Sequence, residues 1–289
     1  MIHTLKNGRL TVEVSSHGAE LRSILYNNRQ YLWQGNPEYW EDRAIVLFPV
    51  VGRCLNDKIA ANGKSYPMEA HGFAQHSEFA LIALSEDSCT LCLSSTEETR
   101  AIYPFDFKLY VTYTLSDSQI CQKLRVENTG SEPLYFTIGG HPGFCCGGES
   151  DSFEDWELIL KDDTSLNTTL VTEDCYISKE KKQVHSENGH ISLARDLFIG
   201  DALIFEETKS NEITLKNKTT AIGVTLDYSD FPVIAAWTLP EDGADFVCLE
   251  PWCGMGHIEG EGADLTERFG MMCITSGGET TKSFTIKIF

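Results

Sequence analysis

The sequence predicts an all-β fold, a large antiparallel β-sandwich. Apolar and polar residues alternate with a period of two in one segment after another, which is typical of strands that bury one face. Polar turn clusters separate neighbouring segments as hairpin loops would, and no segment has the length and period of a crossover helix. The chain of 289 residues shows no linker and no shift in composition, so we expect a single domain over residues 1–289.

The expected strands follow one another along the chain. They span 10–14, 20–25, 79–84, 90–94, 108–115, 120–126, 156–160, 212–215, 221–227, 233–238 and 283–289. Polar clusters predict hairpin turns at 27–28, 86–88, 116–118 and 216–219. The only helix-like segments are short, at 37–40 and 194–198, and the polar stretch 161–189 indicates irregular connections with short strands. No repeat of fixed period is evident, which argues against a propeller.

The charge of the chain limits its partners. It has 23 Lys and Arg against 43 Asp and Glu, a formal net charge of −20. A chain this acidic repels phosphate backbones and anionic lipid surfaces, so nucleic acids and membranes are not expected partners. A small neutral molecule fits this charge best as a ligand.

The N-terminus and the cysteines indicate a compartment. The N-terminus lacks the apolar core of a secretory signal, and the longest apolar stretch, 44–52, is too short to cross a bilayer. We therefore expect a cytoplasmic protein, a monomer or a homodimer, whose ten cysteines stay reduced. Cys89 and Cys92 lie three apart in an expected strand, where their side chains point to opposite faces and cannot share a metal.

Four segments interrupt the alternation, and such interruptions are where functional residues are expected. They are 48–53, 71–74, 139–144 and 248–252, and they contain Arg53, His71, His141, Glu250 and Trp252.

His141 and Glu250 are the most informative of these residues. Glycines and a proline on either side of His141 allow backbone conformations that a regular strand does not adopt, so we expect the imidazole to be aimed from a bend. Glu250 closes an apolar strand, where burial would raise the pKa of its carboxyl towards the range of a base that works near neutral pH. The alternatives are a histidine that caps a turn and a glutamate exposed at a strand end.

Three further residues each have two interpretations. Trp252 is either a platform on which a sugar ring stacks or a part of the core. Arg53 either binds substrate oxygens through its fork of donors or pairs with a surface carboxylate. His71 is either a second polar contact to the substrate or a histidine of a turn. The residues alone do not separate these alternatives.

Taken in order, the segments resemble the motifs of the aldose 1-epimerase (galactose mutarotase-like) family. They are most similar to its shorter bacterial branch, which lies beside the hexose-6-phosphate mutarotases. The matching residues are Phe48-Pro-x-x-Gly-Arg53, His71-Gly-Phe-Ala74, Gly140-His141-Pro142-Gly-Phe144, Gly200-Asp201-Ala202-Leu203 and Leu249-Glu250-Pro-Trp252. Each motif is short, but five of them in the family's order, over nearly the whole chain, are specific.

The resemblance implies a supersandwich of antiparallel sheets with an open carbohydrate cleft and no cofactor or metal. It also implies that Glu250 is the general base and His141 the general acid, with Arg53, His71 and Asp201 at substrate-binding positions. The implied reaction is mutarotation, in which the base removes the C1 hydroxyl proton of a sugar while the acid protonates the ring oxygen. We expect nearby acidic side chains to keep the His141 imidazole charged for this role.

One departure from the family's pattern bears on the substrate. The branch often has an arginine after the His-Gly-Phe-Ala motif, where it helps to bind a sugar phosphate, but this chain has Gln75. Together with the net charge of −20, this favours a free aldohexose over a hexose 6-phosphate. Two other functions stay open. One is a non-catalytic carbohydrate-binding protein on the same fold; the other is a metal site of His71, His141, Glu250 and His257, although these lack the spacing of a metal motif.

Overall fold

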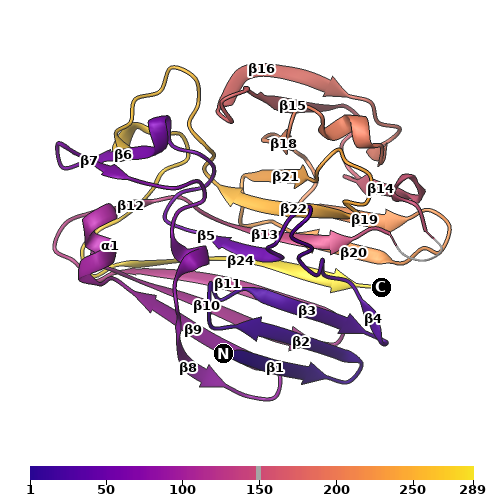
Figure 1. The fold of residues 1–289 in the computed structure, drawn as a ribbon, viewed down its shortest axis with the longest axis horizontal. Helices are drawn as coiled ribbons and strands as arrows, with labels where there is room; N and C mark the ends of the chain where they lie inside the picture. Colours follow the sequence, from indigo (N-terminus) through magenta and orange to yellow (C-terminus); the bar gives the residue numbers. More distant parts are fainter. Residues whose placement is uncertain (148–150) are drawn as a thin grey trace.

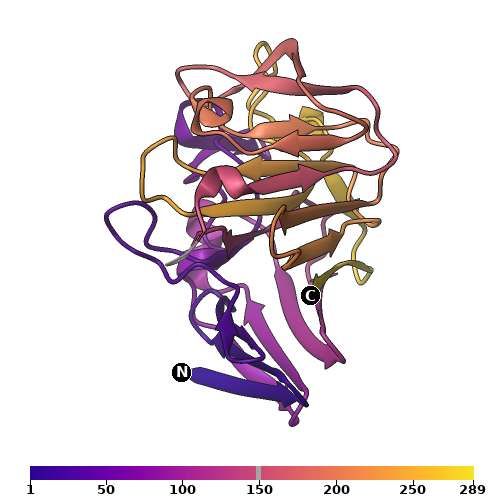
Figure 2. The same cartoon turned by 90° about the vertical axis from the view of Figure 1, so that its right-hand side faces the viewer.

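The structure, a computed structural model, describes residues 1–147 and 151–289. Its strands form two large antiparallel sheets and several smaller ones, so the predicted all-β sandwich is confirmed (Figure 1). In Figures 1 and 2 the N-terminal strands lie at the opposite end of the molecule from the strands of residues 166–205.

The largest sheet has nine strands, and we call it the back sheet. From edge to edge its strands are β17 (His190–Ser192), β14 (Trp156–Ile159), β19 (Glu212–Asn217), β20 (Gly223–Asp227), β24 (Glu279–Ile288), β11 (Gln119–Asn128), β10 (Phe107–Ser116), β9 (Ser88–Ser94) and β8 (Ala80–Leu84). The predicted hairpin turns at 86–88, 116–118 and 216–219 join β8 to β9, β10 to β11 and β19 to β20.

A second sheet has seven strands, and we call it the floor sheet because its outer face forms the floor of the cavity described below. In order its strands are β16 (Ile177–Val184), β15 (Leu166–Val171), β18 (Leu203–Phe205), β21 (Val233–Trp237), β22 (Phe246–Cys253), β13 (Ile138–Cys145) and β5 (Ala44–Leu47). Every residue of β22 is buried, which explains why its sequence is apolar on both faces except at Glu250 and does not alternate.

The main core lies between the back sheet and the floor sheet. Along β22 the side chains alternate, so that Leu249 belongs to this core whereas Cys248 and Glu250 lie on the outer face. On β13, Gly140 lies against Phe284 of β24, and an added Cβ there would come within 2.6 Å of the ring. The two sheets therefore meet closely beneath the floor of the cavity.

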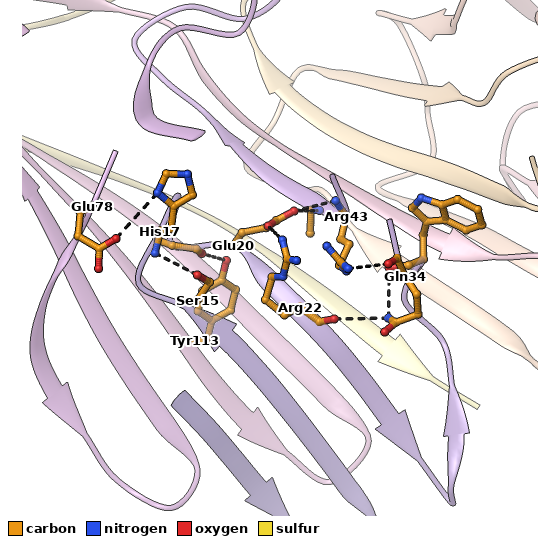
Figure 3. A network of polar contacts seen from close by, with 11 residues as sticks. Ser15, His17, Glu20, Arg22, Gln34, Arg43, Glu78 and Tyr113 are labelled. Carbon is orange, nitrogen blue, oxygen red and sulfur yellow. Dashed lines mark hydrogen bonds and ion pairs between the residues drawn. The ribbon is translucent and has the colours of Figure 1, made fainter. Parts of the chain in front are cut away.

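A four-stranded N-terminal sheet lies next to β5, the edge strand of the floor sheet, and helps to hold β5 in place. Its strands are β1 (Ile2–Asn7), β2 (Leu10–Ser15), β3 (Leu21–Tyr26) and β4 (Arg29–Gln30). The buried carboxylate of Glu20 accepts hydrogen bonds from the backbone N–H groups of Arg43 and Ala44, at 2.7 and 3.0 Å (Figure 3). Arg22 pairs with the same carboxylate at 2.6 Å. Because Ala44 begins β5, Glu20 fixes the start of the strand that lies beside His141.

The remaining elements are short. They are the pairs β6 (Lys58–Ala61) with β7 (Lys64–Pro67) and β12 (Leu134–Phe136) with β23 (Met272–Ile274), helix α1 (Glu97–Ile102), and the 3-10 helices η1 (Leu55–Asp57), η2 (Ala74–His76), η3 (Phe153–Asp155), η4 (Arg195–Phe198) and η5 (Leu265–Glu267).

The helical expectations were only partly right. Residues 37–40 contain turns and no helix, whereas 194–198 contain η4. Helix α1 was not predicted, although Thr96 caps it and accepts a hydrogen bond from the Thr99 N–H. Strands β15 and β16 lie in the stretch 161–189, as expected. Within residues 1–147 and 151–289, the structure has no helix with the length and apolarity needed to span a bilayer.

Candidate active site

A cavity of about 610 Å³ lies over the outer face of the floor sheet. Strands of the floor sheet line its bottom, and segments near 52–57, 70–75, 171–177 and 201–202 line its sides. Every residue that the sequence singled out for the site contributes to the lining, namely Arg53, His71, Gln75, His141, Asp201, Glu250 and Trp252. The fold thus brings residues that lie far apart along the chain to one place.

His141 and Glu250 lie side by side at the floor of this cavity. The antiparallel ladder between β13 and β22 pairs Gly139 with Trp252 and Gly143 with Cys248. His141, midway between the two glycines, therefore stands opposite Glu250. Opposite residues of adjacent antiparallel strands project on the same face. The Nε2 atom of His141 lies 3.1 Å from Oε2 of Glu250, and the side chains are only 9% and 2% exposed.

The backbone around His141 contradicts the predicted bend. Strand β13 runs through the segment without interruption, and none of its glycines has a positive φ. The glycines provide space instead, since a Cβ on Gly139 would lie 2.7 Å from the carbonyl oxygen of Pro251. Glu250 also lies inside β22 and not at its end, so both residues are held by interior strands of a sheet.

Burial shifts the pKa values of the two residues in opposite directions. It raises the pKa of the Glu250 carboxyl well above its usual range, and Asp201 adds to the rise while the Trp252 indole offsets part of it. Burial lowers the pKa of the His141 imidazole well below 6.5, and His71 lowers it further. The direction of this shift runs against the expectation that acidic neighbours keep His141 charged, because burial is its main cause.

His71 is arranged as a neutral hydrogen-bond donor. Its backbone has a φ of 65°, and its Nδ1 accepts the N–H of Gly52 at 3.2 Å, which leaves the proton on Nε2. Part of the ring faces the cavity, but protein surrounds it, and this burial lowers the pKa of His71 to about 4. Its ring meets that of His141 edge-on, with centroids 5.5 Å apart.

Arg53 forms the ion pair with a carboxylate that was one of its two interpretations, and its other interpretation, binding of substrate oxygens, stays a prediction. It lines the cavity, and its guanidinium also binds the carboxylate of Asp57 through two hydrogen bonds of 2.8 and 3.0 Å. Its remaining Nη1 donates to the carbonyl of Asp174 at 3.1 Å. A carboxylate therefore neutralises the guanidinium at the side of the cavity.

Gln75 and Asp201 complete the predicted set. The Gln75 amide nitrogen donates to the carbonyls of Ala70 and Gly72, at 3.1 and 3.2 Å, so it holds the turn that carries His71. Asp201 has a φ of 84° and accepts the N–H of Ala202 at 2.7 Å, and burial raises the pKa of its carboxyl. A non-glycine residue with this backbone conformation is uncommon and often marks a functional position.

Other residues that line the cavity were not singled out from the sequence, among them Trp40, Asp42 and Trp237. The ring centroids of Trp40 and Trp237 lie 5.0 and 5.7 Å from that of His141. Both tryptophans are more exposed than Trp252, which packs in a buried apolar cluster of the floor sheet. Asp42 is a half-buried carboxylate whose pKa is raised by burial and by Glu20. A tryptophan at the end of an apolar strand was the signal available for Trp237.

The potential metal ligands that the structure brings together differ from those considered from the sequence. Among residues 1–147 and 151–289, the group of potential ligands that converges at this site is His141, Cys248 and Glu250, with ligand atoms within 4.8 Å of one another. His71 and His257 do not belong to it, so the set considered from the sequence is not the one that the fold assembles.

Comparisons with known proteins agree with this architecture. A family model described as Aldose 1-epimerase matches residues 1–258. Protein LacX of Lactococcus lactis subsp. lactis, in its chromosomal form, is 30% identical over 98% of both chains. The structure of a galactose mutarotase related enzyme from Lactobacillus acidophilus covers the whole chain with a TM-score of 0.95 at 30% identity, over 97% of its own length. A galactose mutarotase-like protein from Lactobacillus casei has a TM-score of 0.92 at 26% identity, with all of both chains covered.

These matches extend over most or all of the chain and include the strands that carry the cavity. By sequence and by structure, therefore, the chain belongs to the aldose 1-epimerase family and is an isomerase.

Proposed function

We propose that the protein interconverts the α and β anomers of a free aldohexose, with Glu250 as the general base and His141 as the general acid. The observation that supports this most directly is the 3.1 Å contact between these two side chains at the floor of a cavity large enough for a sugar. Family membership supports a mutarotase in general. The substrate and the roles of the residues are our proposal.

The spacing of the pair suits the reaction. Ring opening requires a base at the C1 hydroxyl and an acid at the ring oxygen, and both oxygens are bonded to the same carbon. Acid and base must therefore lie only a few ångströms apart, as side chains from neighbouring strands do. Once the ring is open, the C1–C2 bond rotates, and the ring closes on the other face of the carbonyl with the two roles reversed.

The opposite pKa shifts are compatible with this chemistry because the pair shares one proton. A protonated Glu250 beside a neutral His141 has the same number of protons as a carboxylate beside an imidazolium. Desolvation opposes the singly charged states of the pair, in which a proton has been added or removed. A bound sugar supplies a hydroxyl to the base and an ether oxygen to the acid, and these favour the ionised arrangement that starts the reaction.

The pH dependence of kcat/KM tests this arrangement. Unshifted groups would be active only between the ordinary values of 4.5 for the carboxyl and 6.5 for the imidazole. Because burial raises the pKa of Glu250 and lowers that of His141, the shared proton is lost only at more alkaline pH and a second is gained only at more acidic pH. We expect activity to stay level as the pH rises through 6.5. A loss of kcat/KM with an apparent pKa near 6.5 would contradict the shared proton.

The sides of the cavity supply binding groups for a sugar. His71 offers a neutral N–H donor and Asp201 a carboxylate acceptor, and Arg53 lies at the edge. The rings of Trp40 and Trp237 line the cavity beside His141, and aromatic rings suit the apolar face of a pyranose. Trp252 forms a buried wall.

The charges around the cavity favour an uncharged sugar. Asp42, Asp57 and Asp201 line it together with Glu250, whereas Arg53 is the one Lys or Arg among the described lining residues. Asp57 already binds that guanidinium through two hydrogen bonds. Lys58 and Lys64 lie in the β6–β7 hairpin and do not line the cavity. A sugar phosphate would meet carboxylates without a free cation to bind.

We expect free aldohexoses to exceed their 6-phosphates in kcat/KM by about tenfold or more, the value of one missing charge-assisted hydrogen bond. Exchange between anomers, measured by NMR saturation transfer at physiological salt, checks this. Gln75→Arg is expected to narrow the difference, and the matched variant Gln75→Glu to widen it.

Two results would contradict the proposal in different ways. A preference of the wild type for a 6-phosphate would overturn the substrate class and leave the acid–base pair untouched. Saturable sugar binding without any anomer exchange would instead identify a carbohydrate-binding protein.

A further inference from the structure

The acid–base pair has a third chemically reactive neighbour, the thiol of Cys248. Cys248 precedes Glu250 by two positions on β22, so both side chains lie on the outer face of the floor sheet. Across the ladder it faces Gly143, where an added Cβ would lie 3.2 Å from Sγ. The missing side chain at Gly143 therefore leaves the thiol room beside the imidazole. The cysteine is buried and is not bound in a disulfide.

We propose that His141, Cys248 and Glu250 form an inhibitory binding site for zinc or a similarly thiophilic divalent cation. One imidazole nitrogen, one thiolate and one carboxylate are the donors that zinc prefers, and three protein ligands leave a fourth position open. Hard cations such as magnesium and calcium prefer oxygen ligands in larger number, so the thiol selects against them.

The positions of the ligand atoms fit a small tetrahedral ion. Bonds of about 2.0–2.3 Å to zinc place neighbouring ligand atoms roughly 3.3–3.7 Å apart. Nε2 of His141 and Oε2 of Glu250 are already 3.1 Å apart, and all three ligand atoms lie within 4.8 Å of one another. Small side-chain rotations on two hydrogen-bonded strands are enough to close the site.

An independent observation at the same place is a buried oxygen that lacks a well-formed hydrogen bond. The Oε2 atom of Glu250 is buried, and its one polar neighbour in the described structure is Nε2 of His141, at 3.1 Å but poorly aligned for a hydrogen bond. A buried polar atom without a partner costs free energy, and a bound cation removes this cost. Binding displaces the thiol proton and the proton shared by the pair to solvent.

The position of the ion explains why it would inhibit. It would occupy the lone pairs of both the base and the acid, at the place where the C1 oxygens of a sugar must enter. Inhibition should therefore be competitive with the sugar. This consequence rests on the proposed function, whereas binding of the ion does not.

Cobalt(II) binding provides a test that does not depend on activity. Titration of the protein with Co²⁺ should produce a thiolate-to-cobalt charge-transfer absorption that saturates at one equivalent and disappears in Cys248→Ala. The matched control is Cys253→Ala, a buried cysteine of the same strand that packs in the core on the other face, and it should keep the band.

Inhibition is measured in parallel with Zn²⁺. We expect Zn²⁺ to inhibit the wild type and Cys253→Ala, with activity restored by a chelator. Cys248→Ala should keep mutarotation, but its inhibition constant should rise by about a hundredfold, because even partners outside the ligand sphere are worth about 10–100-fold in metal affinity.

Several results would overturn the proposal. They are the absence of a thiolate band in the wild type, a band that persists in Cys248→Ala, and equal zinc sensitivity of both cysteine variants. A band that is lost only in Cys248→Ala supports the metal site even if no tested sugar is turned over. Failure of the proposed function is thus distinguishable from failure of the metal site.

Discussion

Glu250→Gln and His141→Asn are each expected to lower kcat for mutarotation by about 10²–10⁴-fold, the usual contribution of one positioned acid or base. Glutamine keeps the volume of Glu250 but cannot accept a proton from the sugar. Asparagine keeps a polar group at position 141 but cannot transfer a proton to the sugar. Both side chains lie on interior strands, so the substitutions should leave the ladder between β13 and β22 intact. Polarimetry of a freshly dissolved anomer gives the rate, and circular dichroism shows whether the fold is retained.

A double variant separates a shared role from two independent ones. If the pair works as a unit, Glu250→Gln combined with His141→Asn should be little slower than either single variant. Leu249→Met is the matched control, since Leu249 neighbours Glu250 but faces the core. Turnover like that of the wild type in either folded single variant would remove that residue from the mechanism.

Glu20→Ala is expected to lower the free energy of unfolding by about 3 kcal/mol or more, because unsatisfied buried donors cost about 1–3 kcal/mol each. The carboxylate accepts the N–H groups of Arg43 and Ala44 where β5 begins, and it pairs with Arg22 (Figure 3). Alanine leaves both backbone donors without their acceptor. Urea denaturation measures the change.

Glu20→Gln is the matched variant for this prediction. Its amide oxygen can still accept from the backbone, so we expect it to lose only the pairing with Arg22, and much less stability. If Glu20→Ala and Glu20→Gln were equally stable, the backbone hydrogen bonds at the start of β5 would not be the source of the effect.

The fold was predictable because its signal is local. A period of two over many segments, separated by polar turns, identifies antiparallel strands without any knowledge of their partners. The signal fails where a strand has no covered face. Along β16, an edge strand of the floor sheet, most of the middle residues are exposed, and the sequence there has no alternation.

The residues singled out from the sequence do line one cavity, but their geometry was not predictable. Glycine has two physical uses, a backbone of positive φ and the absence of a Cβ, and the sequence around His141 does not tell them apart. The structure shows the second use, since Gly139 and Gly140 make room for Pro251 and Phe284. Packing against distant strands is not visible in a local motif.

The electrostatic error has a similar cause. We expected nearby acidic side chains to keep His141 charged, but the pKa of a buried imidazole depends on how completely water is excluded. Trp40 and Trp237 were missed because each becomes part of the cavity only when β21 and the segment before β5 approach His141.

Because the acid–base pair lies on interior strands, the residues that carry out the reaction are separated from those that select the sugar. In many enzymes loops supply both. The distance between His141 and Glu250 is set by the spacing of two hydrogen-bonded strands, about 4.7–4.9 Å in any sheet. Arg53, His71 and Asp201, in contrast, lie in connecting segments that tolerate changes of length and sequence. Mutation can therefore alter which sugar is admitted without disturbing how its ring is opened. In such a design, substrate preference is free to diverge among relatives while the chemical step is inherited unchanged.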